Sequence, residues 1–409
     1  NTPKIRFKGF TDDWEQRKLI DYLEVSKLKN KDETYGKEDV LSVSGDYGVV
    51  NQIEFQGRSF AGVSVAPYGV VDTGDVIYTK SPLKSNPYGI IKTNKGKPGI
   101  VSTLYAVYKP LDNVYPEFIQ IYFEQDARMN NYMHPLVNKG AKNDMKVSDE
   151  NALNGEVCFP NRDEQITISA LFANLDYLIT LHQRKCDETK KLKKYMLQKM
   201  FPQKNEKKPE IRFAGFTDDW EQRKLGELAE IVGGGTPSTS VNSYWDGDID
   251  WYAPAEIGEQ IYLESSQRKI TEEGLNKSSA KILPIGTVLF TSRAGIGKTA
   301  ILLKEGCTNQ GFQSIVPNKV KLDSYFIFTR SEELKRYGET VGAGSTFVEV
   351  SGKQMANMEL MMPKTMPEQQ QIGEYFANLD HLITLHQRKC DEIKEVKKFM
   401  LQNMFPQKG

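Results

Sequence analysis

One stretch of the chain occurs twice, and this duplication limits the folds available to the rest. Residues 172–188 (FANLDYLITLHQRKCDE) recur as residues 376–392, and the single difference is Tyr177 against His381. Each copy lies in a longer helical pattern that ends in Met-Phe-Pro-Gln. A repeat of about 200 residues is too long for a solenoid unit. The chain is therefore predicted to contain two copies of a globular domain followed by a helix.

Both copies are predicted to be long helices with defined ends. Asn161 and Thr365 each precede a Glu by three residues, which is a capping-box pattern. Pro202 and Pro406 end the helices because proline has no amide to continue the helical hydrogen bonds. Apolar residues repeat every three or four positions, which favours pairing of the two helices through a heptad seam. The predicted seam residues are Leu175, Leu178, His182, Leu192, Met196, Leu379, Leu382, His386, Val396 and Met400, with Phe172, Ile179, Cys186, Phe376, Ile383 and Cys390 beside them.

The length of the linker between the repeats predicts the direction of pairing. A helix over residues 163–201 is roughly 57 Å long, whereas residues 203–210 span about 28 Å when fully extended. The second helix can then pair with the first only by running back along it. The predicted fold is α+β, with two mixed, β-rich domains separated by two long antiparallel helices in a pseudo-two-fold internal repeat. The alternative is that each helix packs only inside its own domain.

The predicted domain limits follow from the repeated segments and the predicted helix ends. A strap over residues 5–19 recurs at residues 211–225 with one change, Lys8 to Ala214. We expect each strap to dock where a globular domain meets the helices. The predicted segments are a first domain (1–160), a first helix (161–202), a linker (203–210), a second domain (211–364) and a second helix (365–407).

The two globular domains have diverged, but both keep a basic stretch. The chain has no net charge, so any basic surface must be local. Residues 76–109 and 276–304 contain no acidic residue and carry several lysines or arginines. Lysines could hold DNA through its phosphates, while Arg, Asn and Gln could read base edges. The candidate DNA-binding residues are Thr79, Lys80, Ser81, Lys84, Lys92, Lys139, Lys142, Asn143, Thr291, Ser292, Arg293, Lys298, Asn309, Gln310, Gln313, Ser345 and Thr346.

Other readings of these features remain open. A charge run is often only a solvated surface, and a structural adaptor that binds proteins is one alternative. Residues 292–299 resemble a P-loop, but Ser292 replaces the first glycine and a strand-like run follows. A nucleotide-binding enzyme is therefore the less favoured alternative. Residues 86–89 resemble the Asn-Pro-Pro-aromatic motif of DNA amino-methyltransferases but lack its second proline.

No catalytic, metal or cofactor site is predicted. The four histidines form no ligand set, and the four cysteines lack the spacing of disulfides or zinc sites. This cysteine usage is typical of a reducing compartment, so we expect a cytoplasmic protein. No signal peptide or membrane-spanning run is visible in the sequence.

Several motifs, taken in order, make the whole chain similar to the specificity subunits of type I restriction–modification enzymes, which serve bacterial defence. They are the two straps, the Leu-Asp-Leu-Ile-like helix pattern, Glu368-Gln369, and six motifs of the second domain at residues 233–238 (GGGTPS), 244–249 (YWDGDI), 278–284 (SSAKILP), 291–294 (TSRA), 308–313 (TNQGFQ) and 344–347 (GSTF). The first domain matches more loosely.

The resemblance implies a non-catalytic subunit that recognises double-stranded DNA. Two target-recognition domains would each read one half of a bipartite, asymmetric site. The paired helices would set the unspecified spacer and dock two methyltransferase subunits, which endonuclease/translocase subunits would join. S-adenosylmethionine, ATP and Mg would then belong to those partners. The sequence does not reveal the recognised bases, the spacer length or the surfaces that bind the methyltransferase.

Overall fold

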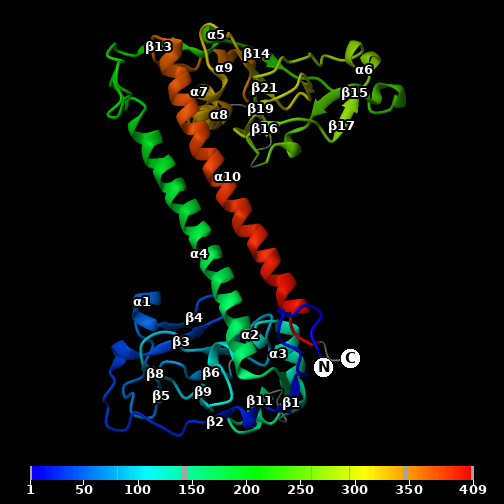
Figure 1. Cartoon of the computed structure of the whole chain (residues 1–409). Coiled ribbons are helices and arrows are strands. Elements are labelled where there is room, and N and C mark those ends of the chain that lie inside the picture. The colour runs from blue at the N-terminus through cyan, green and yellow to red at the C-terminus, as the bar shows by residue number, and fades with distance from the viewer. Residues whose placement is uncertain are drawn as a thin grey trace. The chain divides into compact units, whose positions relative to one another are not determined.

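The computed structural model describes residues 2–80, 82–139, 145–258, 260–293, 295–343 and 349–406. Its contacts divide the chain into unit 1, made of Asn1–Gln183 and Arg388–Gly409, and unit 2, made of Arg184–Gln387. Each unit contains one globular domain and a segment of each long helix (Figure 1). Helices and small sheets occur together in both units, so the α+β prediction is confirmed.

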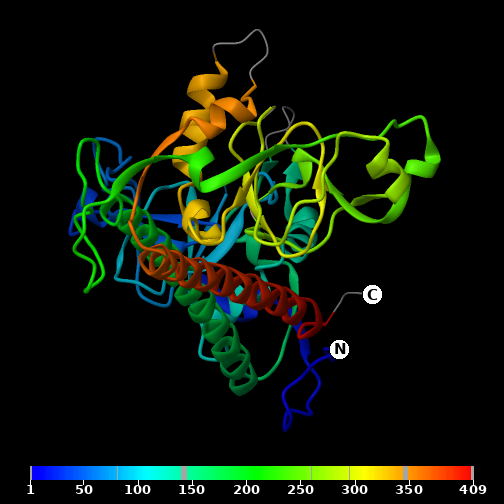
Figure 2. The ribbon, with the colours of Figure 1, turned by 90° about the horizontal axis from the view of Figure 1, so that it is seen from above.

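The two long helices are α4 (Arg162–Lys199) and α10 (Met366–Asn403), with 38 residues each. Figure 2 draws each of them as one continuous ribbon, α4 in green and α10 in orange to red. The predicted cap is present at the start of α4, where the Glu164 amide donates a 3.0 Å hydrogen bond to Oδ1 of Asn161. Both helices end just before a Met-Phe-Pro sequence, as the missing proline amide requires.

The segments of α4 and α10 inside unit 1 run antiparallel. Phe172 faces Phe405 with 6.2 Å between ring centroids, and Cys390 Sγ donates to the Ile179 carbonyl oxygen at 3.9 Å. Lower residue numbers in α4 thus meet higher numbers at the end of the chain. Inside unit 2 the same order holds: Phe201 faces Phe376 at 6.1 Å, and Cys186 Sγ donates to the Ile383 carbonyl oxygen at 3.8 Å.

The predicted seam is correct at some positions and wrong at others. Leu379 is buried, and the other predicted positions that lie in the seam are half-buried: Leu175, His182, Met196, His386 and Met400. Leu178, Leu192, Leu382 and Val396 are instead exposed and belong to the flank of each helix. Phe172, Cys186, Phe376 and Cys390, which the sequence places beside the seam, are fully buried.

This error has a simple physical cause. A heptad seam alternates steps of three and four residues, and a step of three from Leu175 gives Leu178, whereas a step of four gives Ile179. Both residues are apolar, so composition does not distinguish the two registers. The structure uses the second register, which also brings Lys193 into the seam opposite Asp380.

The globular domain of unit 1 is built from short strands joined by long loops. Its main sheet has the strand order β2-β9-β6-β7, and smaller antiparallel pairs are β3-β4, β5-β8 and β10-β11. The strands are β2 (Leu23–Val25), β3 (Leu41–Ser44), β4 (Gly48–Asn51), β5 (Gly69–Val71), β6 (Val76–Thr79), β7 (Ile90–Thr93), β8 (Gly99–Val101), β9 (Tyr105–Pro110), β10 (Asn138–Lys139) and β11 (Met145–Lys146). The helices are α1 (Gln52–Gln56), α2 (Pro116–Tyr122) and α3 (Asp126–Met133).

The globular domain of unit 2 has a five-stranded sheet, β14-β21-β18-β19-β16, and a three-stranded sheet, β17-β15-β20. The strands are β14 (Ala229–Gly233), β15 (Trp245–Tyr252), β16 (Tyr262–Leu263), β17 (Arg268–Ile270), β18 (Val288–Phe290), β19 (Thr299–Leu302), β20 (Cys307–Thr308) and β21 (Gln313–Pro317). The helices are α5 (Leu225–Leu228), α6 (Glu272–Asn276), α7 (Ser324–Thr329), α8 (Ser331–Gly342) and α9 (Gly352–Ala356).

Each strap joins its globular domain to the helices. In unit 1, β1 (Glu15–Lys18) pairs with β12 (Glu156–Phe159), the strand that leads into α4. In unit 2, β13 (Glu221–Lys224) pairs in the same register with β22 (Glu359–Met362), which leads into α10. Each strap therefore docks at the start of a long helix, as expected.

A buried ion pair fixes each strap to its helix. Nε and Nη2 of Arg6 each donate a 2.8 Å hydrogen bond to the carboxylate of Glu164. Arg212 binds Glu368 in the same way at 2.7 and 2.9 Å. The two carboxylates are buried in the first turn of α4 and α10, where the helix dipole also favours negative charge.

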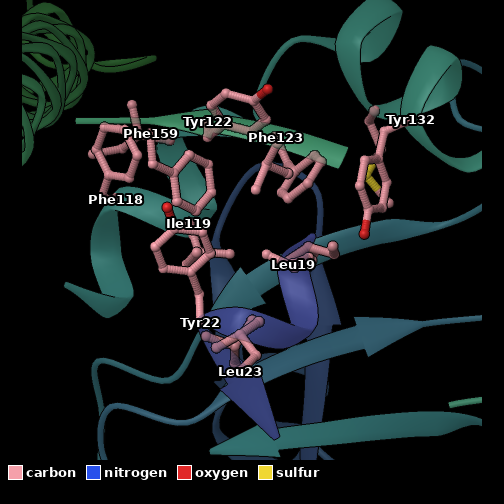
Figure 3. Close-up of a cluster of buried hydrophobic side chains, with 14 of the residues drawn as sticks. Leu19, Tyr22, Leu23, Phe118, Ile119, Tyr122, Phe123, Tyr132 and Phe159 are labelled. Atoms are coloured by element: carbon pink, nitrogen blue, oxygen red, sulfur yellow. The ribbon is translucent and has the colours of Figure 1, made fainter. Parts of the chain in front are cut away.

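The core of unit 1 connects its globular domain to the helices through aromatic side chains. Figure 3 shows Tyr22, Phe118, Tyr122 and Phe159 gathered in one cluster. Phe118 and Phe159 meet edge to face at 5.1 Å, a contact worth about 1 kcal/mol beyond burial itself. Phe172 of α4 belongs to the same cluster. In unit 2 the corresponding cluster contains Trp220, Phe326 and Phe376.

Candidate nucleic-acid interface

The two basic stretches form loops at the end of equivalent strands. In unit 1, the chain leaves β6 at Thr79, and the Lys80 amide donates a 3.2 Å hydrogen bond to the Leu104 carbonyl oxygen. In unit 2, the chain leaves β18 through Thr291, and the Ser292 amide donates a 2.8 Å hydrogen bond to the Gly311 carbonyl oxygen. In both units, then, the loop after one strand is held against the turn that precedes the neighbouring strand. We call this arrangement the loop pair.

The loop pair of unit 1 contains two of the predicted residues in accessible positions. Lys84 is exposed in the loop between β6 and β7. The Lys80 ammonium is partly exposed and lies 2.6 Å from Asp149 Oδ1, so its charge is partly balanced within the protein. Thr79 is buried in β6, and only 5% of its surface is exposed. The prediction that Thr79 contacts DNA is therefore not supported by its position.

The position of Lys92 contradicts its predicted contact with a DNA phosphate. It lies in β7, where all four residues are buried, and only 8% of its surface is exposed. Burial away from water lowers the pKa of its ammonium group, because the charged form loses hydration. A phosphate contact needs an exposed ammonium, so the assignment of Lys92 as a phosphate ligand is wrong in this structure.

The loop pair of unit 2 presents Arg293 and Lys298, which are both exposed. The Arg293 Nε lies 2.8 Å from Glu349 Oε1, a contact that orients the guanidinium while leaving it accessible. Thr291 and Ser292 are fully buried, so they do not lie on the surface as predicted. Thr291 instead shapes the loop: its hydroxyl donates to the Gly295 carbonyl oxygen at 2.8 Å and accepts from the Lys298 amide at 2.9 Å.

The turn before β21 carries the predicted amide side chains. Gln310 is exposed, Asn309 and Gln313 are half-buried, and Asn309 Oδ1 accepts from the Gly311 amide at 2.8 Å. The Gln310 side chain also accepts a hydrogen bond from the Thr236 hydroxyl. A Cβ atom at Gly234 would lie 1.9 Å from the Asn309 carbonyl oxygen, so only glycine allows the 233–236 segment to pack against this turn.

The remaining predicted residues are not placed. Ser81, Lys142, Asn143, Ser345 and Thr346 lie outside the described residues, and for Lys139 only its backbone in β10 is described. Sequence reasoning missed Thr236 and Glu349, which contact Gln310 and Arg293. The glycines before Thr236 were the one sequence signal that pointed to a close backbone approach there.

The P-loop-like motif leads into a strand. After Thr299 the chain continues as strand β19, whereas a P-loop requires the start of a helix at this point. Asn86 lies in a turn, and its amide donates to Asp126 Oδ1 at 2.6 Å. Within the described ranges, no group of three or more His, Cys, Asp or Glu side chains is arranged to hold a metal ion. None of the helices in the part of the chain that the structure describes has the length and apolar character needed to span a bilayer.

Comparison with known proteins agrees with the motifs. Residues 217–395 match the family model described as the type I restriction modification DNA specificity domain. The MjaIX type I restriction enzyme specificity subunit of Methanocaldococcus jannaschii is 34% identical over 190 residues, which are 46% of this chain and 44% of that protein. This match thus spans less than half of that relative's length.

Two further proteins are similar over nearly the whole chain. The protein named MjaX type I restriction enzyme specificity subunit, also of Methanocaldococcus jannaschii, is 24% identical over 97% of this chain and 94% of its own. The crystal structure of a type I restriction-modification system S subunit from M. genitalium covers 100% of both chains, with a TM-score of 0.63 and 13% identity. At that identity the structural likeness shows the fold alone.

These matches all point to one class of protein, the type I restriction enzyme specificity subunits. Residues 217–395 are similar to the type I restriction modification DNA specificity domain. The resemblance of the chain to type I restriction enzyme specificity subunits, which the sequence motifs indicate, is thereby confirmed.

Proposed function

We propose that this chain is the non-catalytic DNA-recognition subunit of a type I restriction–modification complex. The globular domain of each unit would read one half of a bipartite, asymmetric site in double-stranded DNA. The observation that carries this proposal is the loop pair, which the two units build with the same backbone hydrogen bond but with different side chains. A repeated scaffold with different loops is what two separate recognition events would require.

The exposed side chains of the loop pairs have the chemistry for both kinds of DNA contact. Lys84 and Lys298 are suited to phosphates, and Arg293 and Gln310 are suited to base edges in the major groove. The Glu349 carboxylate holds Arg293 by one nitrogen, so the other nitrogens remain for a bidentate contact with guanine. Phosphate contacts would supply affinity, and base contacts would supply selectivity.

The long helices would set the spacer and dock the partner enzymes. In this proposal the two recognition domains lie at opposite ends of an antiparallel helix pair, so helix length fixes the gap between half-sites. The support is the antiparallel order of the contacts inside each unit.

The exposed apolar flank suggests where methyltransferase subunits would bind. Leu178 and Val396 are exposed in unit 1, and Leu192 and Leu382 are exposed in unit 2. These residues occupy repeat-equivalent positions, so each unit offers one copy of the same surface. Two copies of a surface fit two copies of one partner. Endonuclease/translocase subunits would join this core, and S-adenosylmethionine, ATP and Mg would be bound by the partners. Such a complex acts on genomic DNA and would be cytoplasmic.

DNA binding measured at several salt concentrations tests this proposal. The full chain, alone and with its methyltransferase, is titrated with two kinds of duplex DNA. One has a mixed sequence, and the other contains the specific site that the complex methylates. We expect steep salt dependence, since released counterions drive phosphate binding, and tighter binding to the specific site. Protein binding without DNA binding would instead support a structural adaptor. Saturable binding of ATP by the isolated chain would support an enzyme.

A further inference from the structure

The loop pair of unit 1 differs from that of unit 2 in exposing apolar side chains. Leu104 lies in the turn before β9 and is 62% exposed, although its carbonyl oxygen holds the Lys80 amide. Leu83, in the loop after β6, is 41% exposed. Tyr47, at the tip of the β3–β4 hairpin, is 69% exposed, and its ring packs on the half-exposed ring of Phe55 with 5.1 Å between centroids.

Strand register places these side chains at one end of the domain. Thr79 pairs with Tyr105 and with Ile90, so the loop after β6 and the turn before β9 begin side by side. Val40 and Ile100 form a parallel bridge, so β3 and β8 run in the same direction. The hairpin tip that follows β3 therefore lies toward the same end as the turn that follows β8. Val43, Val49 and Tyr105 pack on one cluster beneath this edge.

Unit 2 uses polar groups at the equivalent edge. Gly311 takes the place of Leu104 as the acceptor of the loop amide, and the exposed neighbours are Gln310, Arg293 and Lys298. Among the described residues of this loop pair (291–293, 295–298 and 309–311), none is a large apolar side chain in an exposed position. The two domains therefore present different chemistry on the same scaffold.

The charges around the apolar edge favour DNA over a protein partner as the occupant. The basic stretch at residues 76–109 contains no acidic residue, and Lys84 is exposed beside Leu83. Lys80 lies in the same loop, paired with Asp149, and Asp46 is an exposed carboxylate at the hairpin tip. Double-stranded DNA combines phosphates with one strongly apolar feature in its major groove, the C5-methyl group of thymine.

We infer that the domain of unit 1 recognises thymine methyl groups in its half-site through Leu104, with Leu83 and Tyr47 completing the apolar contact. This inference rests on the proposed DNA-recognition function and adds the base chemistry of one half-site. In contrast, the domain of unit 2 would read its half-site through hydrogen bonds from Arg293 and Gln310.

Replacing thymine by uracil provides a direct test, because it removes the methyl group and keeps the base pair. The specific site is first identified by mapping methylation, and duplexes with uracil at each specified thymine, one at a time, are then titrated with the full chain and its methyltransferase. At one or more thymines of one half-site, uracil should weaken binding of the unchanged protein by about fourfold, the value of a buried methyl-sized group.

The variant Leu104→Ala should bind the thymine and uracil duplexes with equal affinity at that position. The matched control is Leu111→Ala, because Leu111 is 37% exposed but follows the opposite end of β9. It should keep the full thymine preference. Since Leu104 is exposed, its truncation leaves the core intact, and an unchanged unfolding transition confirms this.

Specific binding with no uracil effect at any position, or a uracil effect that Leu104→Ala leaves unchanged, would overturn the inference while leaving the proposed function in place. A recognised DNA site whose specified bases include no thymine in either half would also overturn it. Absence of sequence-specific DNA binding altogether would instead contradict the proposed function.

Discussion

The Nζ atom of Lys193 in α4 lies 2.6 Å from Oδ1 of Asp380 in α10. The internal repeat forms the same contact with the partners exchanged, because Lys397 of α10 lies 2.6 Å from Asp176 of α4. The first contact lies within unit 2 and the second within unit 1. Each unit therefore joins its two helix segments with an ion pair at a repeat-equivalent position.

The globular domain of each unit contributes a third group to this ion pair. In unit 2, the Tyr325 hydroxyl donates to Asp380 Oδ2 at 2.9 Å. In unit 1, Glu124 accepts from Lys397 at 2.5 Å. The third group contacts a different member of the pair in each unit: the Tyr325 phenol binds the aspartate, whereas the Glu124 carboxylate binds the lysine.

Removal of Lys193 should destabilise unit 2. The variant Lys193→Met leaves Asp380, a residue that is 8% exposed, without a cationic partner. We expect a loss of about 2 kcal/mol in the free energy of unfolding, because a nearly buried charge is left unpaired. Urea unfolding followed by circular dichroism measures this loss.

Two comparisons show whether the unpaired charge is the cause. Lys194 is the exposed neighbour in the sequence, and Lys194→Met should change stability by less than about 0.5 kcal/mol. The double variant Lys193→Met with Asp380→Asn should recover part of the loss. Equal destabilisation by both lysine variants would argue against a specific role for the ion pair.

Arg293 should control selectivity at a single base pair. The variant Arg293→Ala should cost about 1–3 kcal/mol in binding of the specific site and relax the preference at one position, since a bidentate guanine contact is lost. Binding measurements on a set of single-base variants of the site give both values. An equal loss of affinity for every sequence would contradict the assignment of Arg293 to a base.

Lys84 should contribute to affinity without contributing to selectivity. The variant Lys84→Ala should weaken binding to all sequences alike and reduce the slope of log affinity against log salt by about one, as expected for one phosphate contact. Titrations at four salt concentrations measure this slope. A change in base preference without a change in slope would contradict the phosphate assignment.

Lys92 should affect stability and not DNA binding. Because burial lowers the pKa of Lys92, the unfolded chain binds the proton more tightly than the folded chain does. The resulting destabilisation is fully present below the folded-state pKa and disappears as pH rises toward the unfolded value of about 10.4. Lys92→Met should therefore stabilise the protein at neutral pH by about 1 kcal/mol, and this gain should shrink at alkaline pH.

Unfolding measured from pH 7 to pH 10 tests this expectation. The control is Lys95→Met, because Lys95 is exposed three residues further along the chain, and its stability should follow that of the unchanged protein at every pH. A loss of DNA affinity in Lys92→Met with no change in stability would restore Lys92 as a phosphate ligand.

The flank of each helix pair should bind one methyltransferase subunit. Leu178→Asp places a charge on the exposed apolar flank of unit 1 and should reduce the number of bound methyltransferase subunits from two to one, measured by native mass spectrometry. Thr180→Asp changes an exposed residue two positions away and should leave two subunits bound. Two bound subunits with Leu178→Asp would contradict docking at this flank.

Sequence patterns predicted the helices well because capping residues and proline act locally. The start of α4 after Asn161 and the antiparallel order of the helix contacts both follow from the printed sequence. The register of the seam did not follow, because Leu178 and Ile179 are equally apolar. Packing around Cys390 and the Lys397–Asp176 ion pair decides between them, and this depends on the partner helix.

In the loops, too, the sequence predicted only part of the candidate site. The basic composition of residues 76–109 indicated a functional surface, but it did not distinguish Lys84 in a loop from Lys92 in a buried strand. The sequence also did not indicate which residues far apart in the chain contact each other. The pairing of Arg293 with Glu349 joins two loops that the chain brings together only on folding.

The most direct test of the account is the methylation pattern of a genome in cells that carry this chain with its methyltransferase, compared with cells that carry the Arg293→Ala variant. We expect a bipartite motif with a fixed gap, and relaxation by Arg293→Ala within one half of the motif only. A continuous motif without a gap, or relaxation of both halves by this one substitution, would contradict the claim that each domain reads its own half-site.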